Sequence, residues 1–150
     1  MSDENRKFLW AKGLFNGIIA WVLGFVLYLV PAFVVAIKMG FELGPESDDP
    51  KAVSEKISQT ISGMYQDNLV LTFGFIILTS LLILWRSKIV TSAALSNHIV
   101  NGLLVAVFPL LFSLVFMIST GFGFTSIIEF VLFLGAGYLG GYLSSVRVKR

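Results

Sequence analysis

The stretch TSIIEFVLFLGAGYLGGYLSSV, residues 125–146, decides the fold class. It carries a single formally charged residue, Glu129, and it is as long as the roughly 20 mostly apolar residues that a membrane-spanning helix needs. It is also rich in glycine, alanine and serine, which allow helix backbones to approach closely in lipid. The stretch therefore predicts a helix that crosses a membrane and packs tightly against a neighbour.

Composition extends this prediction to the whole chain. Of its 150 residues, 56% are hydrophobic and only 13% are charged, with a mean hydropathy of +0.86. A soluble domain carries about 25% charged residues, so the sequence predicts an all-α, polytopic membrane protein. There is no cysteine, which excludes thiolate catalysis and cysteine-ligated metals. The net charge of +2 does not indicate a nucleic-acid partner, because the basic residues flank the apolar runs.

Charges and turn signals divide the chain into four spans within a single integral membrane domain, 1–150. The expected spans are about 13–37, 69–85, 99–118 and 125–146. No residue from 89 to 128 is formally charged at neutral pH, and that run is twice as long as one span. The polar residues at 96–98 and the glycine-rich turn at 119–123 divide it. Residues 89–96 are expected to lead into the third span or to add a turn to its helix.

The polar segment 38–68 is expected to form an external loop, and it holds six of the nine carboxylates. Within it, Asp49 followed by Pro50 resembles an N-cap and a first helical position. The apolar residues that follow recur at helical spacing: Val53, Ile57, Ile61 and Met64. We expect a short amphipathic helix over about 50–64, on the membrane surface or over the bundle, between the first and second spans.

Basic residues predict the orientation. Eight of the eleven lysines and arginines fall on one side of the four-span arrangement: Arg6, Lys7, Lys12, Arg86, Lys88, Arg147, Lys149 and Arg150. The positive-inside rule then places both termini in the cytoplasm and the acidic loop outside. The predicted location is a cell membrane, plasma or inner, in multi-pass form.

Two stripes of small residues predict which spans touch. The first span carries Gly13, Gly17, Ala20 and Gly24. The last span carries Gly137, Gly140, Gly141 and Ser145. These two antiparallel spans are expected to pack small face against small face. The alternatives are that one stripe forms a contact between two copies of the chain, or that the glycines reflect only the high frequency of glycine in membrane helices.

Glu129 is the main candidate for a functional polar residue, because ionisable groups within a span are costly and usually serve a function. Helical periodicity places it on the packed face with Ala136, Gly140 and Ser144. Lys38 is expected at the same outer end and is a candidate partner. The functional interpretation is a proton or cation site. The structural alternative is an interfacial carboxylate that reaches water or a backbone amide.

Asn97, His98 and Asn101 form a polar patch at the inner end of the third span. Imidazole titrates near neutral pH, so a proton relay is one interpretation. The other is that the patch caps a helix at the level of the lipid headgroups. One histidine without cysteine supplies too few ligands for a protein-only metal site, and no cofactor is expected.

Two functional hypotheses remain. Because the common catalytic motifs are missing, the chain is not expected to be an enzyme. The first hypothesis is a non-catalytic accessory or scaffold subunit, or a self-assembling bundle, whose partners are the lipid bilayer and a second copy or a membrane complex. The alternative is a small channel or transporter for protons, cations or small solutes that uses Glu129. The halves show no inverted repeat of the kind that many transporters contain.

Overall fold

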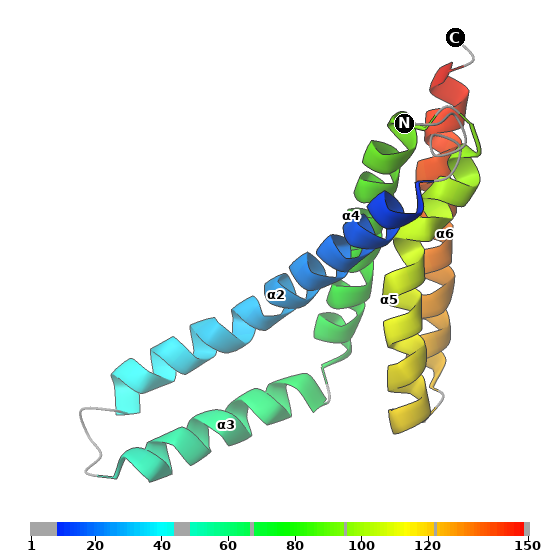
Figure 1. Cartoon of the computed structure of the whole chain (residues 1–150). Helices are drawn as coiled ribbons and strands as arrows, with labels where there is room; N and C mark the ends of the chain where they lie inside the picture. Colours follow the sequence, from blue (N-terminus) through cyan, green and yellow to red (C-terminus); the bar gives the residue numbers. More distant parts are fainter. Residues whose placement is uncertain (1–8, 44–48, 67, 95, 122, 149–150) are drawn as a thin grey trace. The chain divides into compact units, whose positions relative to one another are not determined.

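A computed structural model of the chain describes residues 9–43, 49–66, 68–94, 96–121 and 123–148 (Figure 1). These residues form helices and no strand, so the expected all-α class is confirmed. The helices that they form are α2 (Trp10–Leu43), α3 (Pro50–Gln66), α4 (Leu69–Ser92), α5 (His98–Thr120) and α6 (Phe124–Val148). The helices α2, α4, α5 and α6 are long and apolar enough to cross a membrane. They correspond to the four expected spans.

Two helices extend past their expected ends. α4 does not end at Trp85 but continues to Ser92, so residues 89–92 belong to this helix and do not lead into α5. Charged side chains such as Lys88, which is exposed, do not interrupt backbone hydrogen bonding, and a helix can carry them beyond the apolar layer. α2 likewise runs through Pro31 to Leu43 without a break.

The described chain forms two compact units, which share α2 and α4. The bundle unit comprises the described parts of 1–24 and 76–150, and the hairpin unit comprises those of 25–75. The first part of α2 and most of α4 thus belong to the bundle unit with α5 and α6. The rest of α2, α3 and the first turns of α4 form the hairpin unit. The single domain expected over 1–150 stays a prediction.

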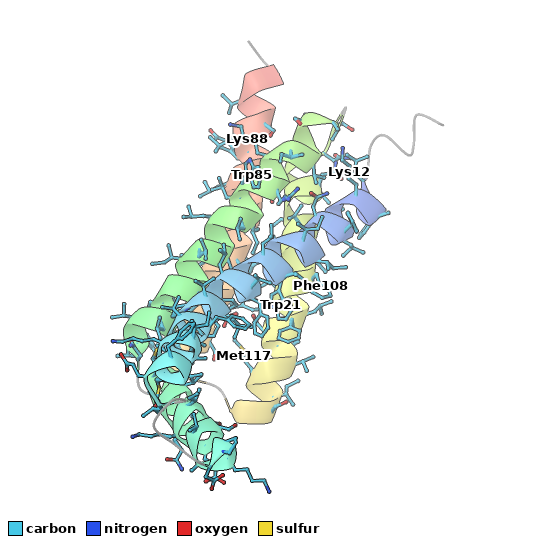
Figure 2. The ribbon with its side chains drawn as sticks, turned by 90° about the vertical axis from the view of Figure 1, so that its left-hand side faces the viewer. Lys12, Trp21, Trp85, Lys88, Phe108 and Met117 are labelled. Carbon is cyan, nitrogen blue, oxygen red and sulfur yellow. The ribbon has the colours of Figure 1, made fainter. Side chains whose placement is uncertain are left out.

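α5 is the central helix of the bundle unit. α6 runs antiparallel alongside it, and the second half of α4 lies next to both (Figure 1). Figure 2 shows Trp21 of α2 and Phe108 of α5 facing each other, with an edge-on ring contact at 6.1 Å between centroids. The largest fully buried apolar side chains of this unit come from three helices: Phe133, Ile76, Ile83, Val90 and Val105.

The two glycine stripes do not pack against each other, so the expected pairing of the first and last spans is wrong. On α6, Gly137 lies against Ala106 and Leu103 of α5, and Gly141 lies against His98 and Ile99 of α5. Gly140 lies against Ser87 and Leu84 of α4. On α2, Gly13 and Gly17 face Leu104 and Val105 of α5, whereas Gly24 faces Thr79 of α4. Each stripe therefore packs against α5 and α4, and the sequence pattern did not predict either helix as its partner.

Two other members of the stripes behave differently. Ala20 is fully buried, as expected for a packing position. Ser145 is only half-buried, and its hydroxyl donates to the carbonyl of Tyr142 within the same helix, 2.7 Å away. The buried serine of this turn is Ser144.

The backbones of α5 and α6 approach each other closely at Gly102. A Cβ atom added there would lie 2.4 Å from the carbonyl oxygen of Gly137 and 2.8 Å from the amide nitrogen of Gly141. These are backbone atoms that no change of rotamer can move. Any side chain at position 102 would force the two helices apart.

The hairpin unit pairs α3 with the second part of α2. The Tyr65 hydroxyl donates to the carbonyl of Tyr28 at 2.7 Å, and the Tyr28 ring lies between those of Tyr65 and Phe75, at 4.7 and 5.1 Å between centroids. Ile61 of α3 also closes an apolar hollow of about 170 Å³ with residues of α2: Leu29, Ala32, Phe33 and Ala36. A helix is thus present where one was expected, while its place at a membrane surface stays a prediction.

Substitution of Gly102 by alanine should destabilise the bundle by about 1–3 kcal/mol or more, the usual cost of overpacking a tight interior. The matched control is Gly135→Ala on α6, where an added Cβ meets nothing within 4 Å. Reversible unfolding in mixed micelles measures both. Equal stabilities of the two variants would contradict the close α5–α6 contact.

Candidate functional site

Several buried polar groups of the bundle unit lie at contacts between helices, and Glu129 is the clearest case. α6 places it one turn before Phe133, which is completely buried. Ser113 of α5, only 4% exposed, donates its hydroxyl to Glu129 Oε1 at 2.5 Å. Glu129 therefore points to the packed side of α6, as its periodicity predicted. The partner that the structure gives it is a side-chain hydroxyl, which neither interpretation named.

Lys38 forms an ion pair within its own helix. Its ammonium group lies 3.7 Å from the carboxylate of Glu42, one turn further along α2, and both side chains are largely exposed. Exposed pairs of this kind contribute about 0.3–0.5 kcal/mol. Lys38 belongs to the hairpin unit and Glu129 to the bundle unit. A direct Lys38–Glu129 pair stays a prediction.

The polar patch at the start of α5 contacts the end of α4 and the residue just before α2. His98 Nδ1 lies 3.0 Å from the carbonyl oxygen of Thr91, in the last turn of α4. The fully buried Asn101 accepts a hydrogen bond from the backbone N–H of Leu9, just before α2, and donates to the carbonyl of Ser96. These bonds satisfy backbone groups that helix ends leave without intrahelical partners. The contacts of His98 and Asn101 fit the capping interpretation.

Asn97 contributes through its backbone. It adopts a left-handed conformation, with φ 57° and ψ 37°, at the N-cap position of α5. Asparagine tolerates this conformation better than most residues, which allows the short turn between α4 and α5. The exposed Asn97 side chain forms no capping hydrogen bond.

A cluster of hydroxyl side chains, which the sequence analysis did not predict, connects α4 to its two neighbours. Ser87 donates to the carbonyl of Gly102 on α5 at 3.0 Å. The Thr91 hydroxyl lies 2.6 Å from Ser144 Oγ on α6 and 2.7 Å from the carbonyl of Ser87. All three side chains are buried. The cluster therefore holds α4 to both α5 and α6.

A signal for this cluster was present in the sequence. Ser87 and Thr91 are four residues apart and so share one face of α4. Ser144 shares a face of α6 with Gly140. Because the predicted second span ends at residue 85, Ser87 and Thr91 lie outside it, and the span alone does not reveal the face that they share.

These contacts hold the helices of the bundle unit together. Among the residues that the structure describes, no three histidine or carboxylate side chains come together as a metal site. The chain matches no protein-family model, and comparison with curated proteins and with solved structures found no match. The function must therefore be argued from the geometry of this chain.

The Ser113–Glu129 hydrogen bond can be measured by a double-mutant cycle with Ser113→Ala and Glu129→Leu. Interhelical hydrogen bonds in membrane proteins contribute about 0.6 kcal/mol on average and up to about 1.7. We expect a coupling energy in this range from unfolding in mixed micelles. Ser119→Ala is the control, because Ser119 is exposed and donates within α5 to Val115. Coupling as weak for Ser113 as for Ser119 would show that the bond does not support the bundle.

Proposed function

We propose that the chain is a non-catalytic integral membrane protein, either an accessory or scaffold subunit or a bundle that assembles with itself. The observation that carries this proposal is how the buried polar side chains of the bundle unit are used. Ser87, Thr91 and Ser113 each hydrogen-bond to a neighbouring helix. Polar groups employed in this way stabilise a packed bundle in lipid.

Membrane insertion is part of the proposal. Its support is the set of four long apolar helices, whose outer faces carry large hydrophobic side chains. Examples with more than half of their surface exposed are Phe15, Val115, Ile118, Ile127 and Val131. Water would penalise such surfaces, whereas lipid chains cover them at little cost. The distribution of basic residues supports cytoplasmic termini and an external acidic loop.

The alternative of a small channel or transporter depends on Glu129. A permeation path needs several polar groups along its length. Glu129 is the one carboxylate among the described residues of the bundle unit, and it is engaged with Ser113. The geometry therefore favours a structural role for this residue over a role in transport.

Liposome flux distinguishes the two functions. Vesicles that contain the wild-type protein should conduct protons and monovalent cations no faster than empty vesicles, and Glu129→Gln should change nothing. Glu42→Gln is the control, because Glu42 is an exposed carboxylate. A flux that persists in Glu42→Gln and disappears in Glu129→Gln would reject the scaffold proposal.

Assembly is the positive test of the same proposal. Crosslinking in intact membranes, followed by light scattering after extraction in mild detergent, should give a protein mass above the 16.5 kDa of one chain. The excess would come from a second copy or from a partner subunit. A strictly monomeric chain in both the membranes and the extract would contradict a scaffold or accessory role.

A further inference from the structure

We propose that Arg86 forms, with the α2–α4 seam of the bundle unit, a binding site for a phosphate group, and that this group is the headgroup phosphate of an anionic phospholipid. The proposal rests on the membrane location proposed above. Among the described residues, the buried side-chain nitrogen and oxygen atoms without a hydrogen-bond partner are those of Arg86 and Thr79, and the Thr79 side chain packs against Gly24.

Arg86 combines a cation–π contact with a buried nitrogen that has no hydrogen-bond partner. Its Nε atom is buried and has no hydrogen-bond partner. Its guanidinium carbon lies 4.8 Å from the centre of the Trp85 ring, a cation–π distance. The adjacent ring restrains the position of the guanidinium.

Helical periodicity places Arg86 along the seam between α4 and α2. Arg86 follows Thr79 by seven residues, so the two lie on nearly the same face of α4. Thr79 contacts α2 at Gly24, where an added Cβ would collide with the threonine side chain. Lys88 lies about 200° around the helix from Arg86 at nearly the same height, and so faces away from this seam.

A second cation, Lys12, lies at the same level of the bundle. Leu9, which lies just before α2, donates its backbone N–H to Asn101 of α5. Gly13 of α2 lies against Leu104 of α5. Ser87, next to Arg86, reaches α5 at Gly102. The start of α2 and the Ser87 turn of α4 therefore contact the same part of α5, residues 101–104. Figure 2 shows Lys12 and Trp85 toward the same end of the bundle, and the Lys12 side chain is exposed.

No protein carboxylate neutralises this end of the bundle unit within the described residues. Glu129 is the one carboxylate there, and it bonds to Ser113, eleven residues or about 16 Å along α5 from Gly102. A phosphate would supply the negative charge that these described residues lack, because guanidinium binds phosphate through two parallel N–H···O bonds. Basic pockets between membrane helices bind anionic headgroups in this way.

Thermal unfolding of the purified full-length protein in a neutral detergent tests the site. Phosphatidylglycerol should raise the Tm, whereas phosphatidylcholine at the same concentration should not. In Arg86→Met, the phosphatidylglycerol concentration needed for half of the shift should rise about tenfold or more, since a charged hydrogen bond contributes about 1.5–3 kcal/mol. Lys88→Met, with the same loss of charge at the same depth, should behave like the wild type.

Inorganic phosphate distinguishes the two sources of the ligand. If it shifts the Tm as far as phosphatidylglycerol, and does so through Arg86, the phosphate site stands but its ligand is soluble and not a lipid. Arg86→Lys retains the charge and loses the planar fork. It serves as the second variant if Arg86→Met does not fold, and it should also bind phosphatidylglycerol more weakly than the wild type.

Three results would overturn the proposal. One is an equal stabilisation of the wild-type protein by phosphatidylglycerol and phosphatidylcholine, which needs no variant. Another is equal responses of Arg86→Met and Lys88→Met. The third is a lipid-independent loss of stability in Asp3→Asn/Glu4→Gln that matches that of Arg86→Met, because the chain would then supply its own counter-ion. Each leaves the proposed function standing, which fails instead if the protein washes off membranes with alkaline carbonate.

Discussion

The backbone contact between α5 and α6 at Gly102 is the constraint on which the bundle unit depends. In the membrane location proposed above, lipid tails are as apolar as the helices, so helix association comes from close packing and from hydrogen bonds between helices. Gly102 meets Gly137 and Gly141 at distances that leave no room for a Cβ atom. α5 is thereby fixed against α6, and its remaining faces become available to α2 and α4.

Hydroxyl groups add hydrogen bonds between the helices that the glycines bring close together. Close approach brings Ser87 within reach of the Gly102 carbonyl, and Thr91 within reach of Ser144. At the other end of α5, Ser113 meets Glu129. A polar group buried in lipid without a partner costs several kcal/mol, so these pairs favour one register of the helices over others.

The polar residues of this chain differ in how far their roles could be predicted. The spacing of Glu129 to Ala136 and Gly140 predicted that it lies on the packed face of α6, because a helix fixes the direction of each side chain. The partner Ser113 did not follow, since it lies on another helix. Asn101 was recognised as polar, but its bond to Leu9 joins residues 92 positions apart. No local pattern predicts such a pairing.

The sequence by itself determined the all-helical class, the four long apolar helices and the faces on which small residues gather. These properties depend on local composition and on the helical period, which neighbouring residues set. Tertiary structure alone decided that both glycine stripes face α5 and α4 and not each other, and that α4 continues past Arg86. Small residues permit close approach without naming a partner, so the choice among helices is made by the complementarity of whole surfaces.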